Sequence, residues 1–348
     1  MKTCHTMKTG KHPFPSRTLR ALGTTVAAMA LALCAALAAA IIAGTLSSCE
    51  HKGFCEPGAA VSRVHVVFDW RNAPGATAKT MSLYLYPETG GEPLRYDFDN
   101  AAGGTVEIPP GTYKAVFLNN DTEAVLLRGT DGYGTFEAYT RPPYLLEPLG
   151  LQGNPAGANP SGEAVCLPPD RLWAGSRTDV EILPPEGPSG AAYDREVTFY
   201  PVEETSRYTV EIRNVRNLKF ASALGLSLSG LSGSLAVAGS ARSALRTMLP
   251  FEARGDEAAS VITGGCHAFG LSASANKMRT LALYVILTDG SKQYYTFDVA
   301  AQVNGAPDPK NVHIVIDGLD LPKPIVEEGG GFMPSVDDWI GENVEVEM

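Results

Sequence analysis

The stretch MSLYLYPETGGEPLRYDF, residues 81–98, decides the fold class of this chain. Its two ends, Met81 to Tyr86 and Leu94 to Phe98, have the two-residue periodicity of half-buried strands. Between them, Pro87 to Gly91 supplies proline and glycine residues that turn the chain. The stretch therefore predicts a β-hairpin.

Neighbouring segments extend this pattern on both sides. Val61 to Trp70 alternates in the same way and predicts another half-buried strand. Thr105 to Ile108 and Thr112 to Leu118, joined by the turn Pro109-Pro110-Gly111, predict a second hairpin, and Thr178 to Leu183 predicts a further strand. Short strands at near-regular spacing with Pro and Gly between them are typical of an antiparallel sandwich rather than of alternating βαβ units.

A run of three prolines and two glycines from Pro184 to Gly190 interrupts the strands, and we predict a domain boundary there. The N-terminal β-sandwich would cover residues 61–187 and the C-terminal one residues 188–322. Gly225 to Gly239 is weakly patterned and predicts a loop or loose edge strands. Together these features predict an all-β fold of two tandem antiparallel β-sandwich domains. The strands predicted in the second half are Arg195 to Val202, Arg207 to Val215, Ala258 to Ile262, Thr280 to Leu287, Tyr294 to Val303 and Val312 to Ile316.

The N-terminal region has the features of a lipoprotein signal peptide, residues 1–48. Five basic residues and no acidic residue precede Glu50, and an Ala/Leu-rich run from Ala21 leads to Leu46-Ser47-Ser48-Cys49. Acylation and cleavage require small residues before a thiol. We therefore predict cleavage between Ser48 and Cys49, lipidation of Cys49, and a tether over residues 49–60.

An uncleaved membrane anchor is the alternative interpretation of the same apolar run, which is long enough to cross a bilayer of roughly 30 Å. Both interpretations place the rest of the chain outside the cytoplasm and next to a membrane. They differ in the anchor, because two or more acyl chains attach a protein stably whereas one is marginal. The sequence thus predicts a lipid-anchored envelope protein.

Composition argues against several classes of partner. The leader holds five of the 28 Lys and Arg residues and none of the 38 Asp and Glu residues, so the processed chain keeps 23 basic against 38 acidic side chains. Such a surface repels phosphate backbones, so nucleic acid is not an expected partner. Cys55, Cys166 and Cys266 remain after processing; this odd number cannot form a complete disulfide framework, and one bridge or three buried thiols both stay open.

The sequence offers few groups for catalysis, and we expect no enzyme activity, cofactor, metal or small-molecule substrate. The histidines of the processed chain are widely separated and lack zinc-ligand spacing. Cys266 and His267 are adjacent, so a strand would point them to opposite faces. Asp131 to Gly134 reads as a turn rather than a phosphate loop, and Asp337-Asp338 as a solubilising pair. These histidines are His51, His65, His267 and His313.

The C-terminal segment, residues 323–348, predicts a glycine hinge followed by a strand. Glu327 to Gly331 contains three successive glycines, and residues 343–348 alternate strictly between polar and apolar. A strand of this kind must pair or it risks aggregation. It could pair with the edge of its own second domain, or it could be donated to a partner by β-augmentation. The residues of this possible donor strand are Trp339, Ile340, Val344 and Val346.

Several short motifs, taken in order, resemble the FimB-type fimbrial anchor and accessory lipoproteins of Bacteroidales. They are the lipobox ending at Cys49, Val66 to Trp70, Ile108 to Tyr113, Asn119 to Glu123, Leu283 to Gly290 and the tail with Trp339. The resemblance covers nearly all of the processed chain.

This resemblance implies two tandem transthyretin-like sandwiches, lipidation at Cys49 in the outer membrane, exposure at the cell surface, and other fimbrial subunits as partners. It implies no catalysis. In polymerising subunits of such pili, a protease cuts after an arginine; Arg63, Arg71 and Arg128 are candidates that no motif marks. A glycan-binding lipoprotein of a polysaccharide-uptake system is the alternative function, and a secreted hydrolase is a third.

Overall fold

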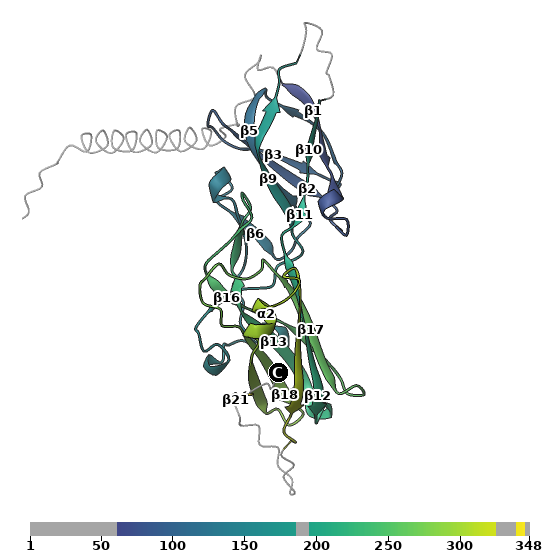
Figure 1. Cartoon of the computed structure of the whole chain (residues 1–348), viewed down its shortest axis with the longest axis vertical. Helices are drawn as coiled ribbons and strands as arrows, with labels where there is room; N and C mark the ends of the chain where they lie inside the picture. Colours follow the sequence, from purple (N-terminus) through teal and green to yellow (C-terminus); the bar gives the residue numbers. More distant parts are fainter. Residues whose placement is uncertain (1–60, 186–194, 325–338, 345–348) are drawn as a thin grey trace, which may run out of the picture. The chain divides into compact units, whose positions relative to one another are not determined.

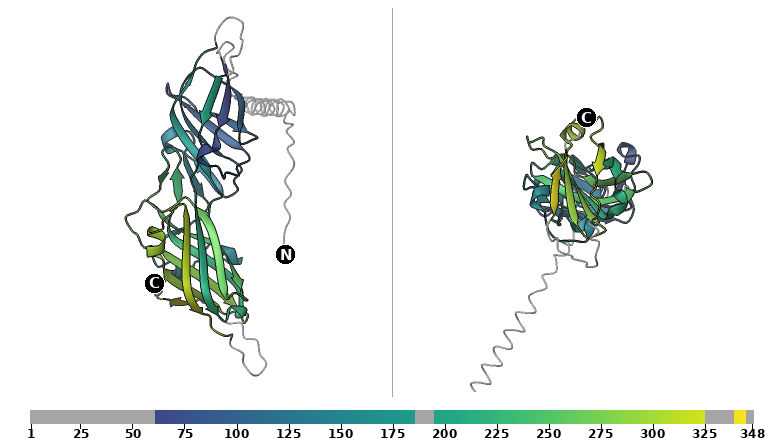
Figure 2. Two further views of the ribbon diagram at one scale, coloured as in Figure 1. Left: turned by 45° about the vertical axis from the view of Figure 1, so that its right-hand side comes forward. Right: turned by 90° about the horizontal axis from the view of Figure 1, so that it is seen from below.

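A computed structural model describes residues 61–185, 195–324 and 339–344 of the chain (Figure 1). The leader, the predicted lipidation site at Ser48 and Cys49, and the tether lie outside these residues. The described residues belong to one compact unit and are mostly β-strand. They build two β-sandwiches, which confirms the predicted all-β class (Figure 2).

The first sandwich is made of a three-stranded and a five-stranded sheet. Its strands are β1 (Ser62–Phe68), β2 (Met81–Pro87), β3 (Leu94–Phe98), β4 (Gly103–Ile108), β5 (Gly111–Asn119), β9 (Trp173–Ile182), β10 (Arg195–Phe199) and β11 (Val202–Glu203). The sheet orders are β10-β1-β4 and β11-β9-β5-β2-β3. The hairpin predicted from residues 81–98 is confirmed, because β2 and β3 pair antiparallel with Met81 opposite Phe98.

Alternating side chains from both sheets fill the core of the first sandwich. Val64, Val66 and Phe68 of β1 are buried, and they pack in one cluster with Leu83 and Leu85 of β2. Burying side chains of this size contributes about 1.5–3 kcal/mol each. The period-two pattern of the sequence therefore identified the core face of these strands.

The second predicted hairpin is wrong, because β4 and β5 lie in different sheets. β4 pairs with β1, whereas β5 pairs with β2 and β9. Pro109 and Pro110 have no backbone N–H to continue a ladder, so the chain turns here from one sheet to the other. The hydroxyl of Tyr113 donates a hydrogen bond of 2.7 Å to the carbonyl of Pro109 and holds this corner.

The second sandwich is formed by a nine-stranded sheet that turns back on itself. Its order is β20-β12-β17-β16-β13-β18-β19-β21, and β8 pairs with β16. The first half of β16 pairs with β13 and its last residues pair with β17. The sheet therefore bends at β16. The strands are β8 (Ala164–Val165), β12 (Ser206–Arg216), β13 (Ala221–Ser232), β16 (Arg246–Asp256), β17 (Val261–Ala268), β18 (Thr280–Leu287), β19 (Lys292–Asp298), β20 (Asn311–Asp320) and β21 (Ile340–Asn343).

The segment Gly225 to Gly239 is a correction to the sequence-based expectation. It holds the end of β13, a strand buried from Gly225 to Ser232 and paired on both sides. Its serines are buried with partners: the hydroxyl of Ser227 lies 2.9 Å from that of Tyr284, and Ser229 Oγ accepts a bond of 2.7 Å from the N–H of Thr280. Small polar residues concealed a central strand because both of its faces are covered.

The chain crosses between the sandwiches later than the predicted boundary. β10 pairs in parallel with β1, and β11 pairs with β9, although both strands follow the Pro184 to Gly190 segment. Described strands on both sides of that segment therefore belong to the first sandwich. The chain first reaches the second sandwich at β8, returns to the first with β9, and leaves the first for the last time between Glu203 and Ser206.

A small four-stranded sheet combines strands from both halves of the sequence, in the order β15-β14-β7-β6. Val116 and Leu118 of β5 pack in one buried cluster with Leu235, Val237 and Phe269. The two sandwiches therefore share a core as well as a chain crossing. These strands are β6 (Val125–Arg128), β7 (Glu137–Thr140), β14 (Ser234–Ala236) and β15 (Ala241–Arg242).

Short helical turns occupy several connections. They are the 3-10 turns η1 (Trp70–Asn72), η2 (Tyr133–Thr135), η3 (Glu147–Leu149), η4 (Ala156–Ala158) and η5 (Leu218–Phe220), and the α-helix α2 (Ala300–Asn304). The predicted pairing of Thr280 to Leu287 with the following strand is confirmed by β18 and β19. The second strand ends at Asp298 rather than Val303, because α2 begins at Ala300.

Candidate functional site

The tail strand β21 is an edge of the second sandwich. It pairs in parallel with β19, with Ile340 opposite Gln293 and Gly341 opposite Tyr294, and the N–H of Val344 donates a bond of 3.0 Å to the carbonyl of Thr296. Of the two pairings that the sequence left open, the free chain thus adopts the intramolecular one. Val346 lies outside the described residues.

The side chain of Trp339 packs the tail against β18 of the second sandwich. Its ring meets that of Tyr284 edge to face, with centroids 5.7 Å apart and an interplanar angle of 88°. Such aromatic pairs contribute about 0.5–1.5 kcal/mol beyond their buried area. Ile340 faces outward with 54% of its surface exposed, whereas Val344 packs against the second core.

Two glycines make room for the ring of Tyr294 beside the tail. A Cβ atom on Gly157 or on Gly341 would overlap the phenol end of Tyr294. Gly157 belongs to η4, and this part of the chain also supplies Leu146 to the buried cluster that Trp339 joins. The tail therefore packs on a surface formed by β18, β19 and the long connection between β7 and β8, residues 141–163.

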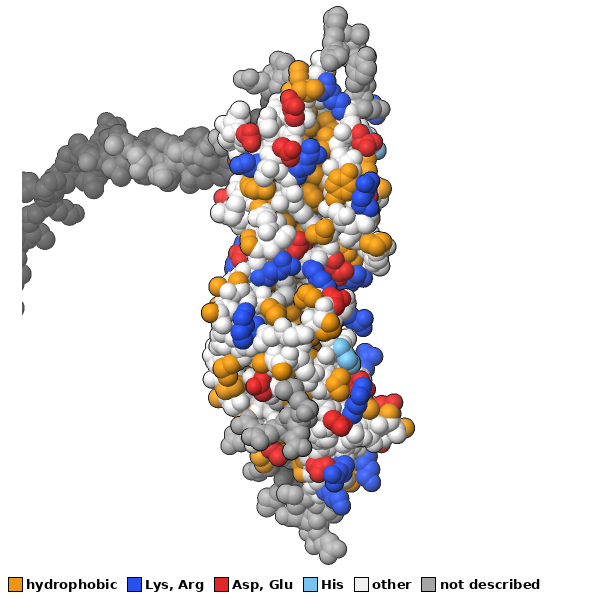
Figure 3. Space-filling view, in the orientation of Figure 1, with side chains coloured by type: hydrophobic (Ala, Val, Ile, Leu, Met, Phe, Trp, Pro, Cys, Tyr) orange, Lys and Arg blue, Asp and Glu red, His pale blue; other side chains and the backbone are white. Residues whose placement is uncertain are grey.

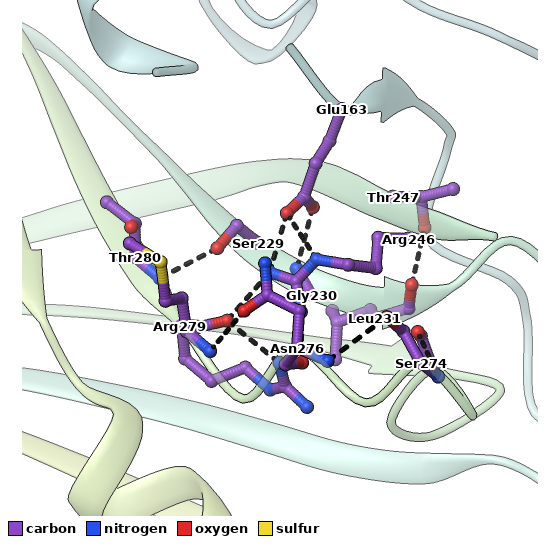
Figure 4. A network of polar contacts seen from close by, with 12 residues as sticks. Glu163, Ser229, Gly230, Leu231, Arg246, Thr247, Ser274, Asn276, Arg279 and Thr280 are labelled. Atoms are coloured by element: carbon purple, nitrogen blue, oxygen red, sulfur yellow. Dashed lines mark hydrogen bonds and ion pairs between the residues drawn. The ribbon is translucent and has the colours of Figure 1, made fainter. Parts of the chain in front are cut away.

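A buried ion pair joins this long connection to the second sandwich (Figure 4). Glu163 Oε1 accepts bonds from Arg246 Nε at 2.9 Å and from Arg246 Nη2 at 2.7 Å, and Glu163 Oε2 accepts one from the N–H of Gly230 at 2.8 Å. The side chains of Glu163 and Arg246 are 4% and 11% exposed. Asn159 orients Glu163, because its side-chain amide bonds to both the N–H and the carbonyl of that residue.

Arg246 also fastens the loop that precedes β18. Its Nη1 and Nη2 atoms each donate a bond of 2.7 Å, to the carbonyls of Asn276 and Met278 respectively. One guanidinium thus holds a carboxylate and two backbone carbonyls in a planar donor fork, which lysine could not reproduce. None of these residues stood out in the sequence, because Glu163 lies in a Gly/Pro-rich stretch and its partner is far along the chain.

The cysteine and histidine candidates are not brought together in a catalytic arrangement. Burial raises the pKa of the Cys266 thiol to about 12, and burial lowers the pKa of the neighbouring His267 imidazole. Cys166 and Cys266 are both free thiols. His65 lies 3.3 Å from the hydroxyl of Thr105, and His313 lies 2.9 Å from that of Thr209, so both are sheet residues with local partners.

Other candidates have structural surroundings. Asp131 to Gly134 is a turn that leads into η2. Arg71 pairs with Asp69 and Arg128 pairs with Glu137, while Arg63 lies within β1. His51, Cys55 and Asp337-Asp338 lie outside the described residues. In the part of the chain that the structure describes, no three His, Cys, Asp or Glu side chains are grouped as metal ligands, and no helix has the length and apolar character needed to span a bilayer.

The exposed surface has no concentrated apolar site on the face shown in Figure 3, where acidic and basic side chains are intermixed and hydrophobic ones form small separate groups. A groove of about 620 Å³ lies over β12 and β17. Its lining includes Arg207, Glu211, His267 and His313 but no Phe, Tyr or Trp among the described residues.

The described residues thus define a two-domain, all-β sandwich protein whose C-terminal strand closes an edge of the second sandwich. The chain belongs to the family described as a domain of unknown function, DUF5119, which matches residues 48–252.

A Bacteroides ovatus protein described as a fimbrium anchoring subunit, Fim4B, is 28% identical over 122 residues, which are 35% of this chain and 33% of that protein. The match thus spans about a third of that relative's length. The sequence resemblance predicted a relative among the fimbrial anchor proteins of Bacteroidales, and this Bacteroides protein confirms that prediction.

A solved structure shares the fold. A Bacteroides ovatus protein described as an adhesin superposes with a TM-score of 0.57 at 22% identity, covering 76% of this chain and 94% of that one. The fimbrial anchor protein Mfa2 from Porphyromonas gingivalis has a TM-score of 0.46 at 14% identity, covering 74% and 90%.

Proposed function

We propose that this chain is a non-enzymatic, lipid-anchored cell-surface protein of fimbriae, acting as an anchor or minor subunit. Its relatives include a protein described as a fimbrium anchoring subunit and a protein described as an adhesin. Acylation at Cys49 would attach it to the outer membrane and leave both sandwiches exposed to other fimbrial subunits.

The observation that carries this proposal is the construction of the tail. Among the described residues, β21 has four residues, lies at an edge, and pairs in parallel with one neighbour, β19. Each backbone hydrogen bond of such a ladder contributes about 1 kcal/mol net. A strand held by few hydrogen bonds can detach from β19 and add to the sheet of a partner protein. Backbone hydrogen bonds then give affinity, and the Trp339 side chain fills a pocket on the partner.

Truncation tests the proposal. Deleting Phe332 to Met348 removes β21 from its edge and removes the strand that a partner would receive. We expect the melting temperature to fall by several degrees, for a loss of about 2–4 kcal/mol from the ladder and the Trp339 contact. Co-purification of fimbrial subunits with the lipoprotein should be lost as well, and a truncated protein that keeps this association would rule out strand donation.

A matched variant separates lost stability from a lost partner. Val303 is buried in α2 of the same sandwich and does not belong to the tail. Val303→Ala should lower the melting temperature by a comparable amount while keeping the fimbrial subunits bound. Loss of association in Val303→Ala would assign the effect to instability instead of to the strand.

A further inference from the structure

Arg279 is a buried arginine with donors that lack acceptors. It directly precedes β18 and is 1% exposed. Its Nη1 donates to the carbonyls of Asn276 at 3.1 Å and Met278 at 2.8 Å, but its Nε and Nη2 have no acceptor among the described residues. Buried polar atoms are almost always hydrogen-bonded, so this arrangement requires a further group.

The charge of Arg279 also lacks a partner. Both carboxylate oxygens of Glu163, the nearby acid, are bonded to Arg246 and to the N–H of Gly230. No ion pair of Arg279 is found in the part of the chain that the structure describes. Gly230 packs directly against the guanidinium, since a Cβ there would lie 2.6 Å from Arg279 Nη1 and 3.0 Å from Cζ. Glu163 thus neutralises Arg246 and leaves one positive charge in the interior.

Tyr208 supplies another unpaired donor in the same region. Its hydroxyl is fully buried and has no hydrogen-bond partner among the described residues. Burial lowers the pKa of Arg279, and so does Arg246, whereas the tyrosine acts in the opposite direction. Tyr208 also packs in one buried cluster with Leu231 and Leu281, which lie next to Gly230 and Arg279 along the chain, and both Tyr208 and Arg279 have hydrogen atoms to donate.

We propose that a small monovalent anion of the size of chloride binds in the interior of the second sandwich, held by Nε and Nη2 of Arg279 and by the hydroxyl of Tyr208. An anion satisfies the unpaired donors and the unpaired charge together. A water molecule would satisfy the donors but would leave the charge uncompensated. The site is independent of the fimbrial role and serves the stability of the sandwich that carries the tail.

The first test measures melting temperature against chloride concentration, with gluconate replacing chloride at constant ionic strength. A ligand that binds only the folded state raises the melting temperature by mass action. Above Kd, we expect the melting temperature to rise by about 3–5 °C for each further tenfold increase in chloride concentration. Arg279→Met should abolish this rise, and Arg254→Met, at an arginine side chain that is 85% exposed, should keep it. A wild-type protein that melts identically in both salts overturns the proposal.

The second test locates the anion without any variant. Crystals of the processed wild-type chain grown in bromide should show an anomalous peak within hydrogen-bonding distance of Arg279 Nε or Nη2. An ordered water there, or a carboxylate from another part of the chain, would overturn the proposal. Tyr208→Phe should weaken the chloride dependence several-fold; an unchanged dependence would remove the hydroxyl from the site.

Discussion

The buried pair of Glu163 and Arg246 gives the sharpest stability prediction. Glu163→Gln keeps the size and one acceptor oxygen of the side chain but removes its charge. Arg246 then stays largely buried with its positive charge uncompensated, close to the fully buried Arg279. We therefore expect a large loss of stability from the replacement of one carboxylate oxygen by an amide nitrogen.

The magnitude follows from the burial of the pair. Breaking a buried pair by removing one charge costs about 3–5 kcal/mol, because the other charge remains desolvated. Since glutamine still accepts one hydrogen bond, we expect about 3 kcal/mol. At 2–4 °C per kcal/mol, the melting temperature should fall by about 6–12 °C.

Glu147→Gln is the matched control. Glu147 pairs with Arg141, but these side chains are 35% and 53% exposed, so the pair should contribute less than about 1 kcal/mol. Urea unfolding of the processed chain, followed by tryptophan fluorescence, compares the two variants directly. If Glu163→Gln is no more destabilising than Glu147→Gln, the pair does not hold the long connection against the second sandwich, and the reasoning fails.

Three further predictions concern attachment, pH and the opposite sheet edge. Cys49→Ser should abolish labelling by a palmitate analogue and leave precursor uncleaved; equal labelling would exclude the lipobox. The hydrogen bond from Arg171 holds the pKa of Glu203 below its ordinary 4.5, so this contribution is present above pH 4.5 and is lost as the pH falls further; urea midpoints from pH 7 to 3 should show a smaller acid loss in Arg171→Gln than in the wild type. Gln302 covers the edge strand β20, because its amide bonds to both the N–H and the carbonyl of Val315 at 2.8 Å. Gln302→Ala should therefore self-associate in sedimentation experiments, and a strictly monomeric variant would contradict this edge-covering role.

Sequence periodicity predicted the strands that have one buried and one exposed face. β1 and β3 follow the two-residue rule because polar side chains such as Arg63 and His65 alternate with the core. β2 was found by its hairpin turn although both of its faces are buried, but other strands with both faces covered were missed. The end of β13 reads as a loop or loose edge strands in the sequence, and no strand was predicted for β16, although most of both strands is buried or half-buried.

Pairing between distant strands was beyond the reach of local pattern. Pro109 and Pro110 mark a turn equally well whether the next strand stays in the sheet or changes sheets. The same limit concealed the buried pair, since nothing around Glu163 indicates that Arg246 lies beside it. The tail was easier to interpret, because a strand with alternating apolar residues must pair with another strand. The sequence therefore predicts two possible pairings, one with the second sandwich and one with a partner protein.

The proposed fimbrial function depends most directly on whether β21 must detach from β19 to bind a partner. Cysteines at the paired positions Gln293 and Ile340 would lock β21 onto β19, since directly opposed strand residues suit disulfide geometry. Co-purification of fimbrial subunits with the Gln293→Cys/Ile340→Cys lipoprotein, before and after reduction, is the measurement, with each single variant as a control. We expect the oxidised protein to fold normally but bind no fimbrial subunit, and reduction to restore binding. Equal binding by the oxidised and reduced forms would contradict strand donation by the tail.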